Sequence, residues 1–257
     1  DCPFCKGCES QTPPTTFALP NEKNWLVRCF ENAFAIVSGE NGRHEVIVES
    51  DKHEKFYQDL SKKELQLVFQ AYCNRFKELS KGHEFVFLFK NHGLKSGASI
   101  MHEHAQIIGL HFMPQLIQHE LKHYAQYRKK TGKCFYCRLS KEKILLQNKS
   151  AVAIVPDFGR FAFETWVLPK RHVKQITDLT QEELMEFALV LQASVKKVFA
   201  KTPDYTIAFH NVTQGKDFHF HAEIYPRTST WAGLELGTGL IVNSKDAGSA
   251  LKELKTK

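Results

Sequence analysis

Apolar residues recur every three to four positions in two stretches of the chain, as expected for helices packed on a core. The first stretch has them at positions 65, 68, 69, 72, 76 and 79, and the second at 184, 187, 188, 191, 195 and 198. A capping box precedes each stretch, Ser61-x-x-Glu64 and Thr180-x-x-Glu183, whose side chains can satisfy free N–H groups of the first helical turn. We therefore predict two equivalent helices that begin directly after Ser61 and Thr180.

Short segments rich in β-branched and aromatic residues flank both helices and predict strands. Each helix should follow a hairpin, made of residues 32–37 and 45–49 in the first half and of residues 151–155 and 164–168 in the second. A further strand, 85–89 or 205–209, should follow each helix and lead to a strand that carries histidines. This order predicts an α+β fold in which an antiparallel sheet with a packed helix is formed twice.

The two halves also match in sequence, which indicates a tandem duplication. Residues 44–53 align with residues 163–172 without a gap, and His102-x-His104-x-Gln106 matches His219-x-His221-x-Glu223. Between the halves, residues 114–130 predict an amphipathic helix closed by Gly132, and its apolar side carries Leu116, Ile117, Leu121 and Tyr124. We expect a first domain at 1–112, a linker helix at 113–133 and a second domain at 134–257.

Each half offers two cysteines and two histidines at matching positions. The sets are Cys2, Cys5, His53 and His102 in the first half and Cys134, Cys137, His172 and His219 in the second. Two thiolates with two imidazoles suit a tetrahedral Zn²⁺ ion, and four protein ligands leave no open position for catalysis. We therefore predict two structural zinc sites. The alternative is that these residues are reduced thiols and hydrogen-bonded histidines of the core.

Period-two alternation places residues 102, 104 and 106 on one face of a strand. If His102 binds metal, His104 is held beside it, and a neutral imidazole is a capable nucleophile toward phosphorus. Gln106 could then orient a phosphate oxygen. The preceding loop, from Asn91 to Ser99, contains two glycines that let backbone amides approach an anion; alone, such a loop is typical of an ordinary turn.

Composition narrows the class of partner without choosing one. The 35 basic and 28 acidic residues give a net charge of +7, which favours anionic partners such as phosphates and nucleotides. Nucleic acid is disfavoured because the chain lacks clustered Lys and Arg with interleaved aromatics. No apolar run is long enough to span a membrane, and the first residues are not a signal peptide, so we expect a cytoplasmic protein without a membrane partner.

Taken together, these motifs resemble the galactose-1-phosphate uridylyltransferase branch of the histidine-triad superfamily. The resemblance rests on Cys-Pro-Phe-Cys at residues 2–5, a distant His, the Asn-x-Gly-x-x-x-Gly-Ala-Ser loop at residues 91–99, and His-x-His-x-Gln at residues 102–106. It implies two histidine-triad-like domains and ping-pong transfer of a nucleotide through a covalent intermediate on His104, with Gln106 in place of a third triad histidine. Carried over by motif, the residues that would hold the nucleotide and phosphates are Asn32, Asn91, Gly97, Ala98 and Ser99.

The second half departs from the family pattern. Its segment 231–243 is similar to the hexose-binding segment, with Gly233 and Glu235 as sugar-binding residues, but Ile241 stands near the place of a Gln that contacts the sugar. In this segment the chain looks more like ADP-glucose phosphorylase relatives, in which inorganic phosphate is the acceptor. His221-x-Glu223 and the shorter loop at residues 211–219 suggest a degenerate second site. Family members also have a segment before residue 2, so we expect either that it is omitted here or that the active site is reduced.

The sequence thus predicts a nucleotidyltransferase or phosphorylase acting on a nucleoside diphosphate sugar, with a sugar 1-phosphate or inorganic phosphate as acceptor. Family members are commonly dimeric, so a homodimer is one option. Two alternatives stay open: a dinucleoside polyphosphate phosphorylase or hydrolase with the same histidine chemistry, and a non-catalytic zinc-stapled nucleotide- or RNA-binding protein.

Overall fold

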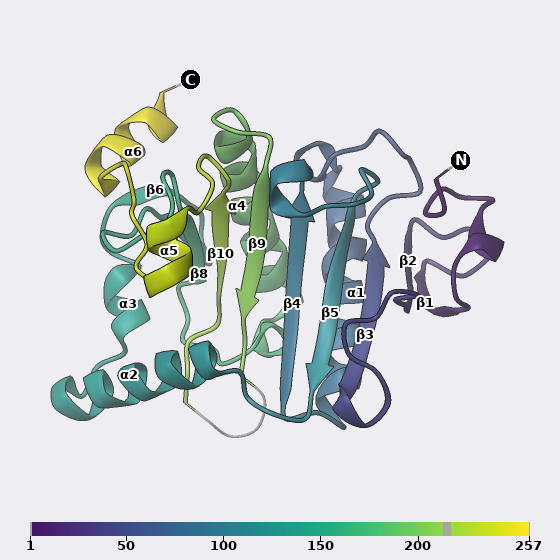
Figure 1. The fold of residues 1–257 in the computed structure, drawn as a ribbon, viewed down its shortest axis with the longest axis horizontal. Coiled ribbons are helices and arrows are strands. Elements are labelled where there is room, and N and C mark those ends of the chain that lie inside the picture. Colours follow the sequence, from purple (N-terminus) through teal and green to yellow (C-terminus); the bar gives the residue numbers. More distant parts are fainter. Residues whose placement is uncertain (1, 213–216, 257) are drawn as a thin grey trace.

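A ten-stranded sheet, antiparallel at every described pairing, runs through the molecule (Figure 1). The computed structural model describes residues 2–212 and 217–256. Part of the second-half loop predicted to be shortened, residues 213–216, lies outside the described residues. The strands are β1 Thr15–Leu19, β2 Val27–Glu31, β3 Gly42–Val48, β4 Phe85–His92, β5 His104–Leu110, β6 Ile144–Gln147, β7 Ala151–Ile154, β8 Thr165–Pro169, β9 Tyr205–His210 and β10 His221–Pro226.

The strand order reads the same outward from the centre of the sheet in both directions. One half runs β4-β5-β3-β2-β1 and the other β9-β10-β8-β7-β6, and β4 pairs with β9 at the centre. The halves therefore share one sheet, whereas the sequence predicted two sheets. Pairing β4 with β9 covers the strand edge that each half would otherwise expose.

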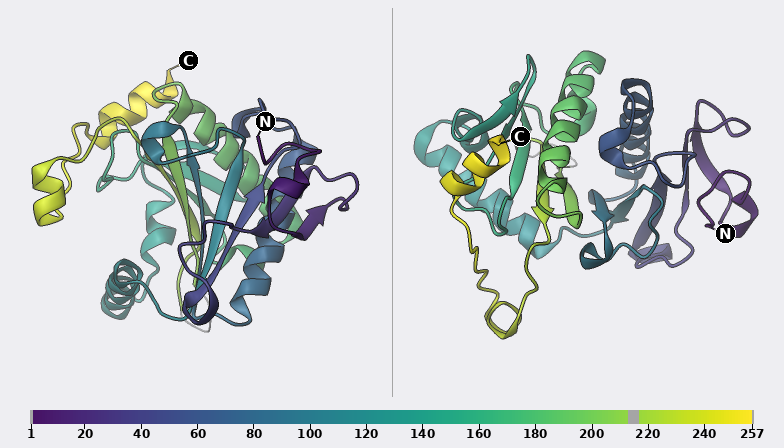
Figure 2. Two further views of the ribbon diagram at one scale, coloured as in Figure 1. Left: turned by 45° about the vertical axis from the view of Figure 1, so that its right-hand side comes forward. Right: turned by 90° about the horizontal axis from the view of Figure 1, so that it is seen from above.

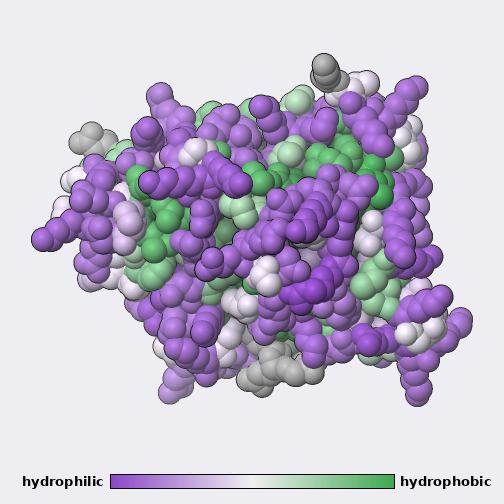
Figure 3. All heavy atoms as spheres, turned by 180° about the vertical axis from the view of Figure 1, so that it is seen from behind, coloured by the Kyte–Doolittle hydropathy of each residue, from purple (hydrophilic) through white to green (hydrophobic). Residues whose placement is uncertain are grey.

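Two long helices, α1 Lys62–Ser80 and α4 Gln181–Phe199, cover one face of the sheet (Figure 2). Both predicted capping boxes are formed, because the Ser61 and Thr180 side chains accept from the N–H groups of Glu64 and Glu183. The predicted apolar stripes pack into the main core. Seen from behind, the outer surface over these helices is mainly hydrophilic, with separate hydrophobic patches (Figure 3).

The remaining helices lie in the linker and the second half. They are α2 Gln115–Thr131, α3 Phe135–Leu139, α5 Gly233–Thr238 and α6 Ala247–Lys255, and short 3-10 turns occur at Glu9–Gln11, Gly39–Asn41, Tyr57–Asp59, Leu94–Ser96 and Ile176–Asp178. The linker helix ends as predicted, with Gly132 in the left-handed conformation. No helix of the described ranges is long and apolar enough to cross a membrane.

Several local predictions were wrong. Residues 32–37 form a loop, and the strand of the first hairpin is β2, because the Asn32 side chain accepts the Phe34 N–H and turns the chain away. His102 lies before β5, outside the strand, and Leu116 is exposed. The alignment of residues 44–53 with residues 163–172 is also shifted by one residue within the strands. It matched Val46 with Thr165, but Val46 pairs with Gln106 and the equivalent partner of Glu223 is Trp166.

Candidate active site and metal centres

A cavity of about 380 Å³ opens on the sheet face opposite α1 and α4 in the first half. Strands β2 to β5 supply its floor, and the segment that follows Cys2 supplies one wall. Six of the seven predicted catalytic and phosphate-binding residues line it: Asn32, Asn91, Gly97, Ser99, His104 and Gln106. The seventh, Ala98, is buried in the same loop. The structure therefore brings these residues, which lie far apart in the sequence, to one cavity.

His104 begins β5 and is almost fully buried against the cavity. Its Nδ1–H donates to the carbonyl oxygen of His102 at 2.8 Å, which leaves Nε2 with a free lone pair. Burial lowers the pKa of His104 to about 4, so the ring is neutral near pH 7. The Phe4 ring packs edge-on against it, with ring centroids 5.2 Å apart. The ring is thus held in the form that a nitrogen nucleophile requires.

The amide side chains of the cavity turn their carbonyl oxygens toward protein donors. Asn91 Oδ1 accepts from the Thr206 hydroxyl at 3.0 Å, and Gln106 Oε1 accepts from His44 Nε2 at 2.8 Å. Each amide NH₂ group is thereby left to donate elsewhere. None of the described residues that line the cavity is a carboxylate. A cavity lined by amide donors without a carboxylate suits the oxygens of a phosphate.

The loop after β4 has the backbone shape that its glycines predict. Gly93 and Gly97 both have positive φ, 83° and 80°, and a Cβ on Gly93 would meet the Asp204 carboxylate at 2.3 Å. Asp204 accepts the Lys95 N–H at 2.9 Å, which ties the loop to the second half of the chain. The 3-10 turn between these glycines therefore presents Gly97 and Ser99 at the cavity.

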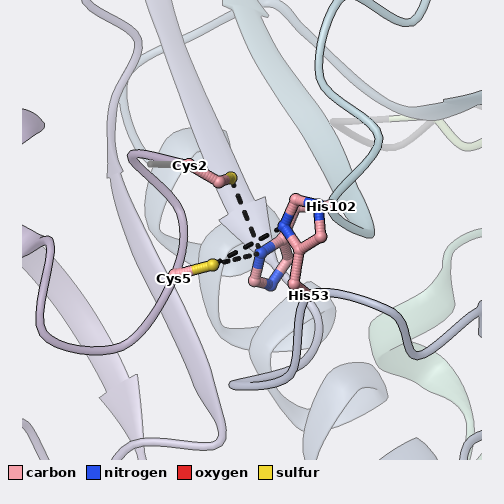
Figure 4. Close-up of side chains that lie close together, drawn as sticks. All are labelled: Cys2, Cys5, His53 and His102. Atoms are coloured by element: carbon pink, nitrogen blue, oxygen red, sulfur yellow. Dashed lines mark hydrogen bonds between the residues drawn. The ribbon is translucent and has the colours of Figure 1, made fainter.

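The first predicted metal set comes together beside the cavity. Figure 4 shows the Cys2, Cys5, His53 and His102 side chains converging, and their ligand atoms all lie within 4.8 Å of one another. The sulfur-to-Nδ1 distances are 3.5–3.8 Å. A tetrahedral zinc ion with its usual bond lengths would hold sulfur and nitrogen about 3.5 Å apart. His102 Nε2–H donates to the Ser50 carbonyl at 2.8 Å, which leaves Nδ1 free to bind metal.

The second predicted set has the same geometry. The Cys134, Cys137, His172 and His219 ligand atoms also lie within 4.8 Å of one another. Sulfur-to-Nδ1 distances are 3.3–3.6 Å, and His219 Nε2–H donates to the Pro169 carbonyl at 3.0 Å. Burial lowers the pKa of His219 to about 3, so it has the neutral form that binds a metal. Both donor sets fit zinc.

The position equivalent to the cavity is filled in the second half. His221 and Glu223 meet His210 of β9 and Glu120 of α2, with their donor atoms within 4.8 Å, so these four side chains could also hold a cation. Tyr136 stacks on His221 at 4.4 Å between ring centroids and donates to Glu120 at 2.6 Å. The sequence carries no signal for this cluster, because Glu120 lies in the linker helix, far from the histidines along the chain.

The predicted sugar-binding residues lie outside the cavity. Gly233 and Glu235 belong to α5, in an arm that stands away from the sheet (Figure 2). Glu235 accepts the Ala232 N–H at 2.9 Å and so caps the short helix. The arm is apolar and exposed, with Leu236 at 73% and Leu240 at 63% exposure. Within one chain, the structure does not bring these residues to His104.

Comparisons with known proteins agree with this architecture. Residues 1–113 match the N-terminal domain of a family described as a domain of unknown function, DUF4931. ADP-glucose phosphorylase of Arabidopsis thaliana is 26% identical, over 98% of this chain and 82% of its own length. Galactose-1-phosphate uridylyltransferase of Thermotoga maritima is 28% identical, over 99% of this chain and 89% of its own.

This chain is a relative of the galactose-1-phosphate uridylyltransferases and of ADP-glucose phosphorylase. The resemblance inferred from the sequence motifs is thus confirmed. A crystal structure of an A. thaliana ADP-glucose phosphorylase with bound ADP-glucose superposes with a TM-score of 0.95, at 25% identity, over 100% of this chain and 90% of that one. The relatives named here are enzymes, which supports the prediction of a nucleotidyltransferase.

Proposed function

We propose that the chain transfers the nucleotide of a nucleoside diphosphate sugar to a phosphate acceptor through a covalent intermediate on His104. The observation that carries this proposal is the state of His104 itself. Its neutral ring keeps Nδ1 on a carbonyl and presents the free Nε2 at a cavity lined by amide donors. Relatives named as nucleotide-sugar phosphorylase and sugar-phosphate uridylyltransferase support the same chemistry.

In the first step, His104 Nε2 attacks the α-phosphorus of the sugar nucleotide. A P–N bond forms as the bond to the bridging oxygen breaks, and sugar 1-phosphate leaves with that electron pair. The His102 carbonyl stabilises the positive charge that develops on the ring, through its hydrogen bond to Nδ1–H. In the second step, an acceptor phosphate oxygen attacks the same phosphorus, the P–N bond breaks, and neutral His104 returns.

We propose ADP-glucose as donor and inorganic phosphate as acceptor. Two observations support this choice. One relative is named ADP-glucose phosphorylase, and Ile241 stands near the place where uridylyltransferases have a Gln that contacts the sugar. A panel of ADP-glucose, UDP-glucose, UDP-galactose and diadenosine tetraphosphate, each with inorganic phosphate or a sugar 1-phosphate, tests it. We expect turnover of ADP-glucose with phosphate. Turnover of diadenosine tetraphosphate alone would contradict the proposal.

We further propose two structural zinc ions per chain, one for each Cys-Cys-His-His set, and an origin of the chain by tandem duplication into the two predicted domains. The repeated donor geometry and the repeated strand order support both ideas. We also propose a cytoplasmic location, where reduced cysteines remain available to bind metal. The Glu120–His210 cluster supports a second half without catalytic activity, because it fills the place of the cavity.

Loss of the two metal sites should have unequal effects on activity. We expect Cys5→Ser and Cys137→Ser each to lower the zinc content, measured by mass spectrometry of the metal, from two ions to one. Only Cys5→Ser should lower turnover by at least about tenfold, because Phe4 and the His102 carbonyl both touch His104. Equal activity of the two variants would contradict a positioning role for the first site.

The exposed arm leads us to propose a homodimer in which α5 of one subunit reaches the cavity of the other, with Gly233 and Glu235 at the sugar. Glu235→Gln keeps a carbonyl oxygen for the Ala232 N–H but removes the charge. We expect it to raise the KM for ADP-glucose about tenfold or more with a smaller change in kcat. An unchanged KM, or a monomer in light scattering, would contradict this arrangement.

A further inference from the structure

The His44 side chain is hydrogen-bonded to Gln106. It lies on β3, is only 2% exposed, and faces the cavity. Its Nε2 is 2.8 Å from Gln106 Oε1, and its Nδ1 is 3.2 Å from the backbone nitrogen of Ile36. The Asn32 amide nitrogen also approaches the ring, at 3.3 Å from Nε2 and 3.4 Å from Nδ1. The ring therefore joins the loop after β2 to the cavity.

The backbone N–H of Ile36 fixes the direction of both hydrogen bonds in the series Ile36–His44–Gln106. The Ile36 N–H can only donate, so His44 Nδ1 must accept and the ring proton must lie on Nε2. Nε2–H in turn needs an acceptor, which requires the carboxamide oxygen of Gln106 to face it. Burial lowers the pKa of His44, in agreement with a neutral ring. A rotated Gln106 amide would set two N–H groups against each other.

The direction of these hydrogen bonds decides which group of Gln106 faces a ligand in the cavity. With its oxygen held by His44, the Gln106 amide directs its NH₂ group away from the ring, and no protein acceptor binds that group within the described residues. A rotated amide would instead offer lone pairs to the oxygens of a phosphate and repel them. Preorganised donors are effective because they need no reorganisation as charge develops.

We propose that His44 is a positioning residue that locks the Gln106 carboxamide with its NH₂ group toward the transferred phosphoryl group. The proposal rests on the proposed function, since it assigns Gln106 to the phosphoryl group that His104 receives. Ile36, His44 and Gln106 form a relay that begins at a main-chain donor and ends in the cavity. In this proposal His44 acts through the Gln106 side chain.

The second half lacks this relay. Val46 pairs with Gln106 and Trp166 with Glu223, so Glu223 stands in the place of Gln106. Two residues before Trp166, just ahead of β8, Glu164 then corresponds to His44. Glu164 accepts the N–H groups of Arg160 and Phe161, and Glu223 accepts from the Arg160 guanidinium at 3.0 Å. Glu164 also accepts the Trp166 Nε1–H at 2.8 Å, so both of its oxygens act as acceptors and it donates no hydrogen bond to Glu223. The relay therefore occurs only in the half whose cavity is open.

Single-turnover kinetics with ADP-glucose test the proposal on four variants: His44→Phe, His44→Gln, Gln106→Ala and the double variant His44→Phe/Gln106→Ala. His44→Phe should slow formation of the nucleotidyl-enzyme about 10–100-fold with little change in the Kd for ADP-glucose. His44→Gln retains an amide donor for Gln106 and an oxygen for the Ile36 N–H, so it should recover most of the rate. In the Gln106→Ala background, His44→Phe should cost almost nothing further.

Additive effects in the double variant, or equal losses in His44→Phe and His44→Gln, would overturn the proposal. If the wild-type chain forms no adduct with ADP-glucose, UDP-glucose or UDP-galactose, the proposed function is wrong. The relay is then judged by ¹⁵N NMR of the histidine rings. We expect His44 as the Nε2–H tautomer, with its Nε2–H signal shifted by Gln106→Ala; a proton on Nδ1 would overturn it.

Discussion

Replacing His104 with Ala should reduce turnover of the sugar nucleotide by at least about 10⁴-fold, as is usual when a catalytic nucleophile is removed. The side chain lies at the cavity wall, and neither metal set includes it, so zinc content should stay unchanged. Steady-state assays with metal analysis and melting temperature check this expectation. An active His104→Ala protein would remove the basis of the proposed mechanism.

The equivalent histidine of the second half offers a matched control. His221 also donates from Nδ1 to a carbonyl two residues earlier, that of His219. Its Nε2, however, faces Glu223 at 3.1 Å, and Tyr136 covers the ring. His221→Gln should therefore leave the covalent step intact wherever the protein is folded. A loss of adduct from folded His221→Gln equal to that of His104→Ala would contradict a single active half.

Replacing Lys90 with Met should lower the free energy of unfolding by about 3–5 kcal/mol, which is typical when one partner of a buried ion pair is removed. Lys90 lies on β4 and is only 1% exposed. Its ammonium group donates to Glu49 at 2.7 Å, to Glu103, and to the His104 carbonyl at 3.3 Å. Burial opposes ionisation of Glu103, but the Lys90 charge outweighs it and lowers the pKa of that carboxyl to about 2.

Urea unfolding measures this loss, with Lys81→Met as the control. Lys81 pairs with Glu78 on the exposed surface at the end of α1, where an ion pair contributes little to the free energy of unfolding. Adding Glu49→Gln and Glu103→Gln to Lys90→Met should recover part of the stability, because no charge is then left unpaired in the core. Equal urea midpoints for Lys90→Met and Lys81→Met would show that the network does not stabilise the fold.

The parts of this molecule that local chemistry dictates could be predicted from the sequence. The capping boxes at Ser61 and Thr180 fix where the long helices begin, and the Cys-x-x-Cys pairs with their distant histidines indicate the two donor sets. His104 and Gln106 could be chosen because period-two alternation places them on one face. Each of these signals either lies within a few neighbouring residues or occurs at matching positions in both halves of the chain.

What the sequence could not predict depends on strand register and on contacts between segments. The joining of the halves through β4 and β9 leaves no local signal. His44 becomes important only because β3 pairs with β5 in the register that sets it beside Gln106. Glu120 reaches His210 only because the linker helix crosses the second half. In these places tertiary contacts decide the role of a residue.

We propose that His104 carries the nucleotide between the two steps, and intact-protein mass spectrometry tests this most directly. The metal-loaded chain is incubated briefly with ADP-glucose, UDP-glucose or UDP-galactose in separate tubes, without acceptor. We expect an adduct of AMP mass from ADP-glucose that is absent in His104→Ala and is discharged by inorganic phosphate. An adduct that persists in His104→Ala, or no adduct from any of the three donors, would contradict the account.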